Sequence, residues 1–62
     1  MRNLTNSEIK GTVVVSKVTD ETFTITGLDE WPTIGAGYKV RDVAGHYCLL
    51  PFKNLEMFQV VE

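Results

Sequence analysis

The chain has little of what very small proteins commonly use to hold themselves together. Among its 62 residues there is one cysteine, Cys48, and one histidine, His46. A single cysteine excludes an internal disulfide, and these two residues supply only part of the ligand set of a structural zinc site. A domain of this length buries only about 60% of the surface that its unfolded chain exposes. Packing or association with another chain must therefore supply the stability, and we expect no metal and no cofactor.

Long apolar runs and an excess of one charge are also lacking. No apolar run approaches the ~20 residues of a transmembrane helix, and the polar residues 1–6 contain no apolar core of a secretion signal. The net charge of −2 provides no field that would attract nucleic acid or an anionic membrane. Together with the lone thiol, these absences predict a cytosolic protein that has no membrane partner.

What the chain does have is a series of short alternating segments rich in β-branched residues. We expect one domain over residues 1–62 and a first hairpin in which residues 12–18 and 23–26 flank a turn at 19–22. The inner face of this hairpin is predicted to carry Val14, Val18, Phe23 and Ile25. After Leu28, which we expect in the core, residues 28–37 form an irregular connection, which is long for so small a domain.

A second hairpin is predicted from residues 38–41 and 46–50 around a turn at 42–45. Pairing Arg41 with His46 sorts the side chains into two faces. The inner face would hold Tyr38, Val40, Tyr47 and Leu49, and the outer face Lys39, Arg41, His46 and Cys48. Pro51 ends the strand, a 3₁₀ turn is expected over 51–56, and Phe58 and Val60 point inward from a last strand.

The N-terminal segment carries the one helix signal. Thr5 and Glu8 have the spacing of a capping box, Leu4 and Ile9 that of a hydrophobic staple, and Gly11 follows as a stop. This pattern predicts one short turn of helix. The alternative is a frayed tail, because termini are commonly mobile.

Five short strands with a 3₁₀ turn before the last one resemble the SH3-like barrel. Residues 47–61 are similar to its strand, its proline-led 3₁₀ turn and its closing strand, and to the corresponding part of small stand-alone phage or bacterial proteins. The resemblance implies an all-β fold, either a five-stranded SH3-like barrel or a rolled antiparallel sheet. It also implies a phage-encoded factor that acts on a host protein.

No catalytic constellation is present. Cys48 and His46 are two residues apart on one predicted strand, which separates their side chains by about 7 Å, too far for direct activation of the thiol. The adjacent acidic pairs at 20–21 and 29–30 lie in predicted turns, where such side chains serve the backbone. We therefore expect no enzyme.

Two groups of residues are candidates for binding. Trp31, with Pro32 and Ile34, forms an exposed anchor for a protein partner, since tryptophan is enriched at binding hot spots. The alternative is that Trp31 folds back as a lid over one open end of the barrel. Lys39, Arg41 and His46, with Tyr47 nearby, are the candidate contacts for nucleic acid.

The sequence thus predicts a small cytosolic protein-binding module with an unidentified protein partner, and as the alternative a small nucleic-acid-binding β-barrel. This second function is disfavoured, because Lys39 and Arg41 are the only permanently charged cations of the group and the chain as a whole is acidic. A homodimer is expected too, because apolar residues remain on the outer faces of the predicted strands. These residues are Val13, Val15, Leu50 and Val61.

Overall fold

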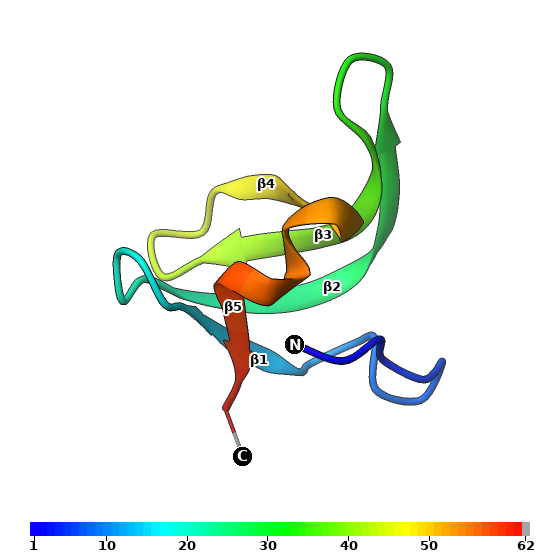
Figure 1. Ribbon diagram of the computed structural model, residues 1–62. Coiled ribbons are helices and arrows are strands. Elements are labelled where there is room, and N and C mark those ends of the chain that lie inside the picture. Colours follow the sequence, from blue (N-terminus) through cyan, green and yellow to red (C-terminus); the bar gives the residue numbers. More distant parts are fainter. Residues whose placement is uncertain (62) are drawn as a thin grey trace.

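The structure, a computed structural model, describes residues 1–61 and forms a single antiparallel sheet of five strands (Figure 1). The elements are β1 (Val13–Ser16), β2 (Thr22–Trp31), β3 (Gly35–Asp42), β4 (Tyr47–Pro51), the 3₁₀ helix η1 (Phe52–Met57) and β5 (Phe58–Val60). The strand order is β4-β3-β2-β1-β5. The predicted all-β fold with a 3₁₀ turn before the last strand is therefore confirmed. None of the described residues belongs to a helix long and apolar enough to cross a membrane.

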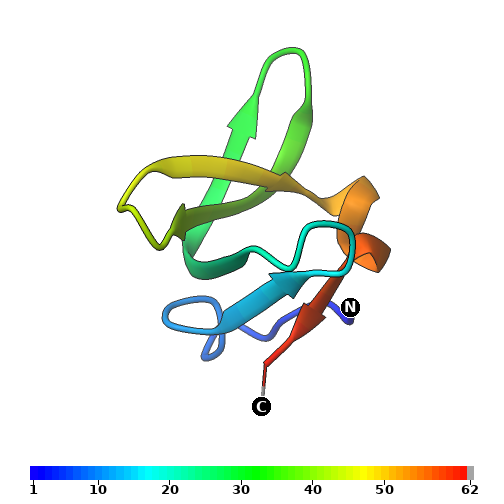
Figure 2. The same ribbon diagram turned by 90° about the vertical axis from the view of Figure 1, so that its left-hand side faces the viewer.

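The shape of the sheet is set by β2, which pairs with both β1 and β3. Its pairing with β3 shifts between Ile25 and Gly27, and the Oγ1 of the intervening Thr26 donates to the Lys39 carbonyl at 3.1 Å. An extra residue of this kind bends a strand and increases its twist. The bend rolls the sheet, and the far half of β2 projects with β3 as a hairpin away from the other elements (Figures 1 and 2).

The core lies inside this rolled sheet and is small. Its fully enclosed members are Val14, Ile25, Tyr38, Val40 and Leu50, each at most 3% exposed. Partly buried apolar residues surround them: Met1, Leu4, Ile9, Phe23, Cys48, Leu55, Phe58 and Val60. Most predicted inner-face residues are therefore confirmed, but Val18, Leu28, Tyr47 and Leu49 are not in the core.

The first hairpin turns earlier than predicted. Val14 pairs with Phe23, and the chain reverses over residues 17–20 instead of 19–22. The pairing of the two strands is displaced by an even number of residues, and side chains alternate between the faces of a strand, so Val14 and Phe23 keep their predicted inner face. Val18 instead falls in the turn and is 68% exposed.

Polar groups that bond to the backbone explain where this turn falls. The Ser16 hydroxyl accepts from the backbone N–H groups of Val18 at 3.2 Å and Thr19 at 3.3 Å. Asp20 adopts a left-handed conformation with a φ of 62°, which aspartate tolerates better than most residues. The serine thus fixes the reversal two residues before the site that the apolar pattern favours.

The irregular connection predicted for residues 28–37 is wrong. β2 continues to Trp31 and β3 begins at Gly35, so only residues 32–34 lie between the strands. Trp31 precedes a proline, which favours an extended backbone, and Gly35 takes a φ of 99° that suits glycine. The Ile34 N–H donates to the Trp31 carbonyl at 3.2 Å and closes the turn.

The second hairpin is displaced by one residue from the prediction. Arg41 pairs with Tyr47 and Val40 with Cys48, which exchanges the two faces of β4. Leu50 is buried and Cys48 packs against the core, while Tyr47 is 57% exposed. The expected inner positions of Tyr47 and Leu49, and the outer positions of Cys48 and Leu50, are therefore wrong.

The physical reason for this displacement is the carboxylate of Asp42. Its Oδ1 accepts from the N–H groups of Ala44 at 3.0 Å and His46 at 2.9 Å. The Asp42 N–H donates to the His46 carbonyl, so Asp42 and His46 close a loop of residues 43–45, one residue shorter than expected. Gly45 ends that loop with a φ of 91°, the left-handed position that such a hairpin loop needs.

The N-terminal segment forms a hydrogen-bonded turn and not the predicted turn of helix. Glu8 accepts the Thr5 N–H at 3.0 Å, as in a capping box, and pairs with Arg2 at 2.5 Å. These hydrogen bonds, that from Arg2 first, lower the pKa of Glu8 to about 2. Gly11 then ends the turn with a φ of 95° before any helix forms.

Gly37 provides a test of how closely β3 and β4 approach each other. A Cβ at this position would lie 2.3 Å from the Leu50 carbonyl oxygen, which is backbone and cannot rotate away. We expect Gly37→Ala to lower the free energy of unfolding by about 3 kcal/mol, in the range of overpacked cores. Urea denaturation of Gly27→Ala, whose added Cβ meets nothing within 4 Å, is the control. Equal stabilities of the two variants would contradict this register.

Candidate functional site

The three predicted partner-binding residues lie together at the end of the β2–β3 hairpin. Trp31 is 41% exposed, Pro32 is exposed and Ile34 is partly buried. The Trp31 Nε1 donates to the Asp29 Oδ2 at 3.1 Å, and the Asp29 Oδ1 accepts the Glu30 N–H at 2.8 Å. Trp31 forms the last pair of the hairpin that projects away from the other elements (Figure 1), and this position is not that of a lid over the barrel, its alternative role.

The predicted basic residues are only partly brought together. Lys39 and Arg41 are exposed on β3, and Arg41 lies opposite Tyr47 on β4. The Lys39 ammonium group lies 4.9 Å from the centroid of the Tyr47 ring, the geometry of a cation–π contact. The His46 side chain is 83% exposed at the end of the adjoining loop, with its Nδ1 3.8 Å from the Asp42 carboxylate. Tyr47, expected inside the barrel, therefore joins the two cations instead.

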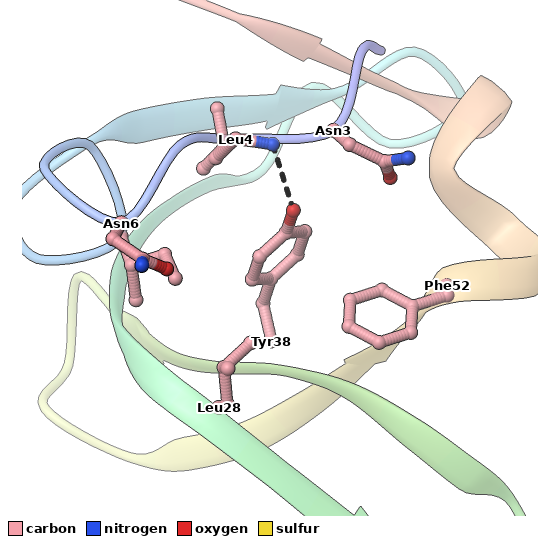
Figure 3. Close-up of a pocket in the computed structure, with 7 residues that line it drawn as sticks. Asn3, Leu4, Asn6, Leu28, Tyr38 and Phe52 are labelled. Atoms are coloured by element: carbon pink, nitrogen blue, oxygen red, sulfur yellow. Dashed lines mark hydrogen bonds between the residues drawn. The ribbon is translucent and has the colours of Figure 1, made fainter.

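A third surface, which the sequence analysis did not identify, is an open pocket of about 400 Å³ beside the root of the hairpin (Figure 3). Its lining comes from the N-terminal segment, β2, β3 and η1: Asn3, Leu4, Asn6, Ile9, Leu28, Tyr38 and Phe52. Leu28 is 60% exposed and Phe52 is 41% exposed, although both are large and apolar.

Tyr38 forms the floor of this pocket and connects it to the core. Its ring meets the Phe52 ring edge to face, with centroids 5.0 Å apart. Its hydroxyl oxygen accepts the Leu4 N–H at 2.9 Å, which holds the N-terminal segment beside the hairpin (Figure 3). The staple spacing of Leu4 and Ile9 was a signal that this segment packs against something, but it did not indicate where.

Cys48 does not have the environment of a reactive thiol. It lies on the inner face of β4, where burial, followed by the nearby carboxylates of Asp42 and Glu21, raises the pKa of its thiol. A raised pKa leaves little thiolate at neutral pH, and the thiolate is the nucleophile. Within residues 1–61, no group of three or more His, Cys, Asp or Glu side chains is placed to hold a metal ion.

Self-association stays a prediction, on a reduced set of residues. Leu50 leaves that set, because it is 1% exposed in the core. Val61 is 51% exposed beyond the end of β5, and Val13 and Val15 on β1 are partly buried.

Comparison of the chain with protein-family models, curated proteins and solved structures finds no match. The resemblance to SH3-like barrels therefore stays a prediction. Three surfaces of the molecule offer binding groups: the hairpin tip, the Lys39–Arg41–Tyr47 face and the open pocket.

The environment of Cys48 predicts slow alkylation. At pH 8 the raised pKa leaves a smaller thiolate fraction than in a free cysteine, so iodoacetamide should react with folded protein more slowly than with N-acetylcysteine. The rate should increase as the pH rises toward the thiol pKa. Mass spectrometry of samples quenched over time measures this rate, and protein unfolded in urea is the control. Folded protein that reacts as fast as N-acetylcysteine at pH 8 would contradict the burial of Cys48.

Proposed function

We propose that the chain is a small protein-binding module whose main contact surface is the tip of the β2–β3 hairpin. The observation that carries the proposal is Trp31, a large aromatic side chain that is 41% exposed at the end of a projecting hairpin. Tryptophan is among the residues that contribute most to binding at protein interfaces. The single thiol of Cys48 supports a cytosolic setting, and the resemblance to stand-alone phage proteins supports a host protein as the partner.

The hairpin tip also has the order that an anchor requires. The bond from the indole to Asp29 restrains Trp31, and Pro32 restricts the backbone that follows. A side chain that is already ordered loses less conformational entropy on binding, so more of its contact energy contributes to affinity. These restraints support recognition of a folded surface or groove by Trp31.

Replacement of Trp31 tests the proposal. Because Trp31 lies outside the core, we expect Trp31→Ala to leave the melting temperature within a few degrees of the wild type. The same change should abolish capture of the cellular partner in affinity purification from a bacterial lysate. Val43→Ala, which removes an 89% exposed apolar side chain from a different loop, is the matched control. Undiminished capture by Trp31→Ala would refute the role of the hairpin tip.

As the chain has no other tryptophan, Trp31 also reports directly on its own environment. Addition of the captured protein should shift the emission of Trp31 to the blue and protect it from iodide quenching. Capture without either change would place the interface elsewhere on the molecule.

A second candidate function, nucleic-acid binding, is favoured by the Lys39–Arg41–Tyr47 face. An exposed aromatic ring beside two cations is an arrangement on which unpaired bases stack while phosphates are neutralised. We rank it second because the face offers two cations on a chain of net charge −2. Affinity for nucleic acid depends largely on the number of phosphates that are neutralised.

Salt dependence of binding to a fluorescent oligothymidine separates the two functions. For the protein-binding module we expect no saturable binding at 150 mM salt. A nucleic-acid site of two phosphate contacts would give a slope of log K against log salt of roughly −1.4. Lys39→Gln and Arg41→Gln should then weaken binding, whereas Lys53→Gln on η1 should not. Such a slope with this mutational pattern would favour the second function over the first.

A further inference from the structure

We propose that the open pocket beside the hairpin root binds an uncharged, extended segment of a partner protein, through one apolar side chain and one backbone carbonyl. This inference rests on the proposed function, because it assumes that the ligand is a protein. It names a second contact site, on residues other than those of the hairpin tip.

The walls of the pocket suit an apolar side chain. Leu28 and Phe52 line the pocket together with Tyr38 and are 60% and 41% exposed, and Leu4 and Ile9, which also line it, are partly buried. Exposed apolar groups that gather around a hollow commonly mark a binding site, whereas single ones do not. The volume of about 400 Å³ accommodates a leucine or phenylalanine side chain with its flanking backbone.

The floor of the pocket carries a hydrogen-bond donor without an acceptor. Tyr38 is 3% exposed, and its hydroxyl oxygen accepts the Leu4 N–H. A phenol hydroxyl is also a donor, and among residues 1–61 its proton has no acceptor. A buried donor gains most from an acceptor that arrives with the ligand.

The rim determines which kind of acceptor fits. Asn3 and Asn6 lie at the edge of the pocket (Figure 3), and none of the lining residues carries a charge at neutral pH. A carboxylate or phosphate would lose hydration here without gaining a counter-charge. A peptide carbonyl carries no charge, so it can accept a hydrogen bond from the Tyr38 hydroxyl at a much smaller cost in hydration. The carboxamides of Asn3 and Asn6 can form hydrogen bonds with the adjacent peptide groups. The chemistry of the pocket therefore favours an uncharged peptide.

Blocked amino acids are the probes for this site. We expect N-acetyl-leucinamide and N-acetyl-phenylalaninamide to shift the backbone amide signals of Leu4, Leu28 and Phe52 in ¹H–¹⁵N spectra. The equally short but charged N-acetyl-glutamic acid amide should not shift them at pH 7. Leu28→Glu, at a position where the side chain is 60% exposed, should keep the fold and weaken binding of the leucine probe more than tenfold. Val43→Glu, with its side chain in a distant loop, is the matched control.

The hydroxyl is tested by Tyr38→Phe, which keeps the ring and should weaken binding of the leucine probe about fivefold, the value of one neutral hydrogen bond. If Tyr38→Phe does not fold, the effect of Leu28→Glu on binding of the leucine probe tests the proposed site instead. Shifts that are absent, lie elsewhere or survive Leu28→Glu would overturn the proposal. Equal affinity for toluene, which has no carbonyl, would make the pocket a general apolar site and overturn it as well.

Two further outcomes separate this site from its alternatives. If the same signals shift with protein concentration alone, the occupant is a second copy of the chain and the proposal fails. Trp31→Ala should leave binding of the leucine probe unchanged, because Trp31 does not line the pocket. If Trp31→Ala loses cellular capture but still binds the probe, the result supports the hairpin tip and the pocket as separate sites. If the wild-type protein does not bind the probe, the result refutes the pocket site and leaves the hairpin tip untouched.

Discussion

The bend in β2 is the feature on which the rest of the structure depends. β2 changes direction at Thr26, so that it pairs with β1 at one end and forms the projecting hairpin with β3 at the other. The five enclosed core residues come from four different strands, so they meet only because the sheet is rolled. The same bend carries the far half of β2 away from that core. One local irregularity therefore encloses the apolar residues and exposes the tip that we propose for binding.

The apolar pattern was sufficient to predict that the strands exist, but it fixed neither the full length of β2 and β3 nor how the strands pair. Alternation identified Val14, Ile25 and Val40 as inward-facing, and Pro51 located the start of η1. The turns depended on single polar atoms: the Ser16 hydroxyl in one hairpin and the Asp42 carboxylate in the other. In strands this short, side-chain hydrogen bonds to nearby backbone influence the position of a turn as strongly as the burial of apolar residues does. A displacement of one residue was enough to exchange the two faces of β4.

The candidate sites differ in how far they could be predicted, because they differ in how many segments build them. Trp31, Pro32 and Ile34 are nearly contiguous, so their grouping was evident, whereas their exposure required knowing that β2 continues to Trp31. Tyr47 could join Lys39 only after the β4 register was known. The pocket takes residues from four segments between Asn3 and Phe52. No local sequence pattern predicts that these segments come together, because their contact depends on where the N-terminal segment lies against the rolled sheet.

Tyr38 belongs to two structures at once, since it is an enclosed core residue and also the floor of the pocket. A molecule that settles on this ring binds the folded chain and not the unfolded one, so it adds its own binding free energy to the stability of the fold. A domain with so few enclosed side chains has little stability in reserve. Occupancy of the pocket would then increase the fraction of chains that are folded in the cell, and so the lifetime of the protein. If the pocket binds a partner protein as proposed, the amount of the chain would follow the amount of that partner, without any dedicated regulatory device.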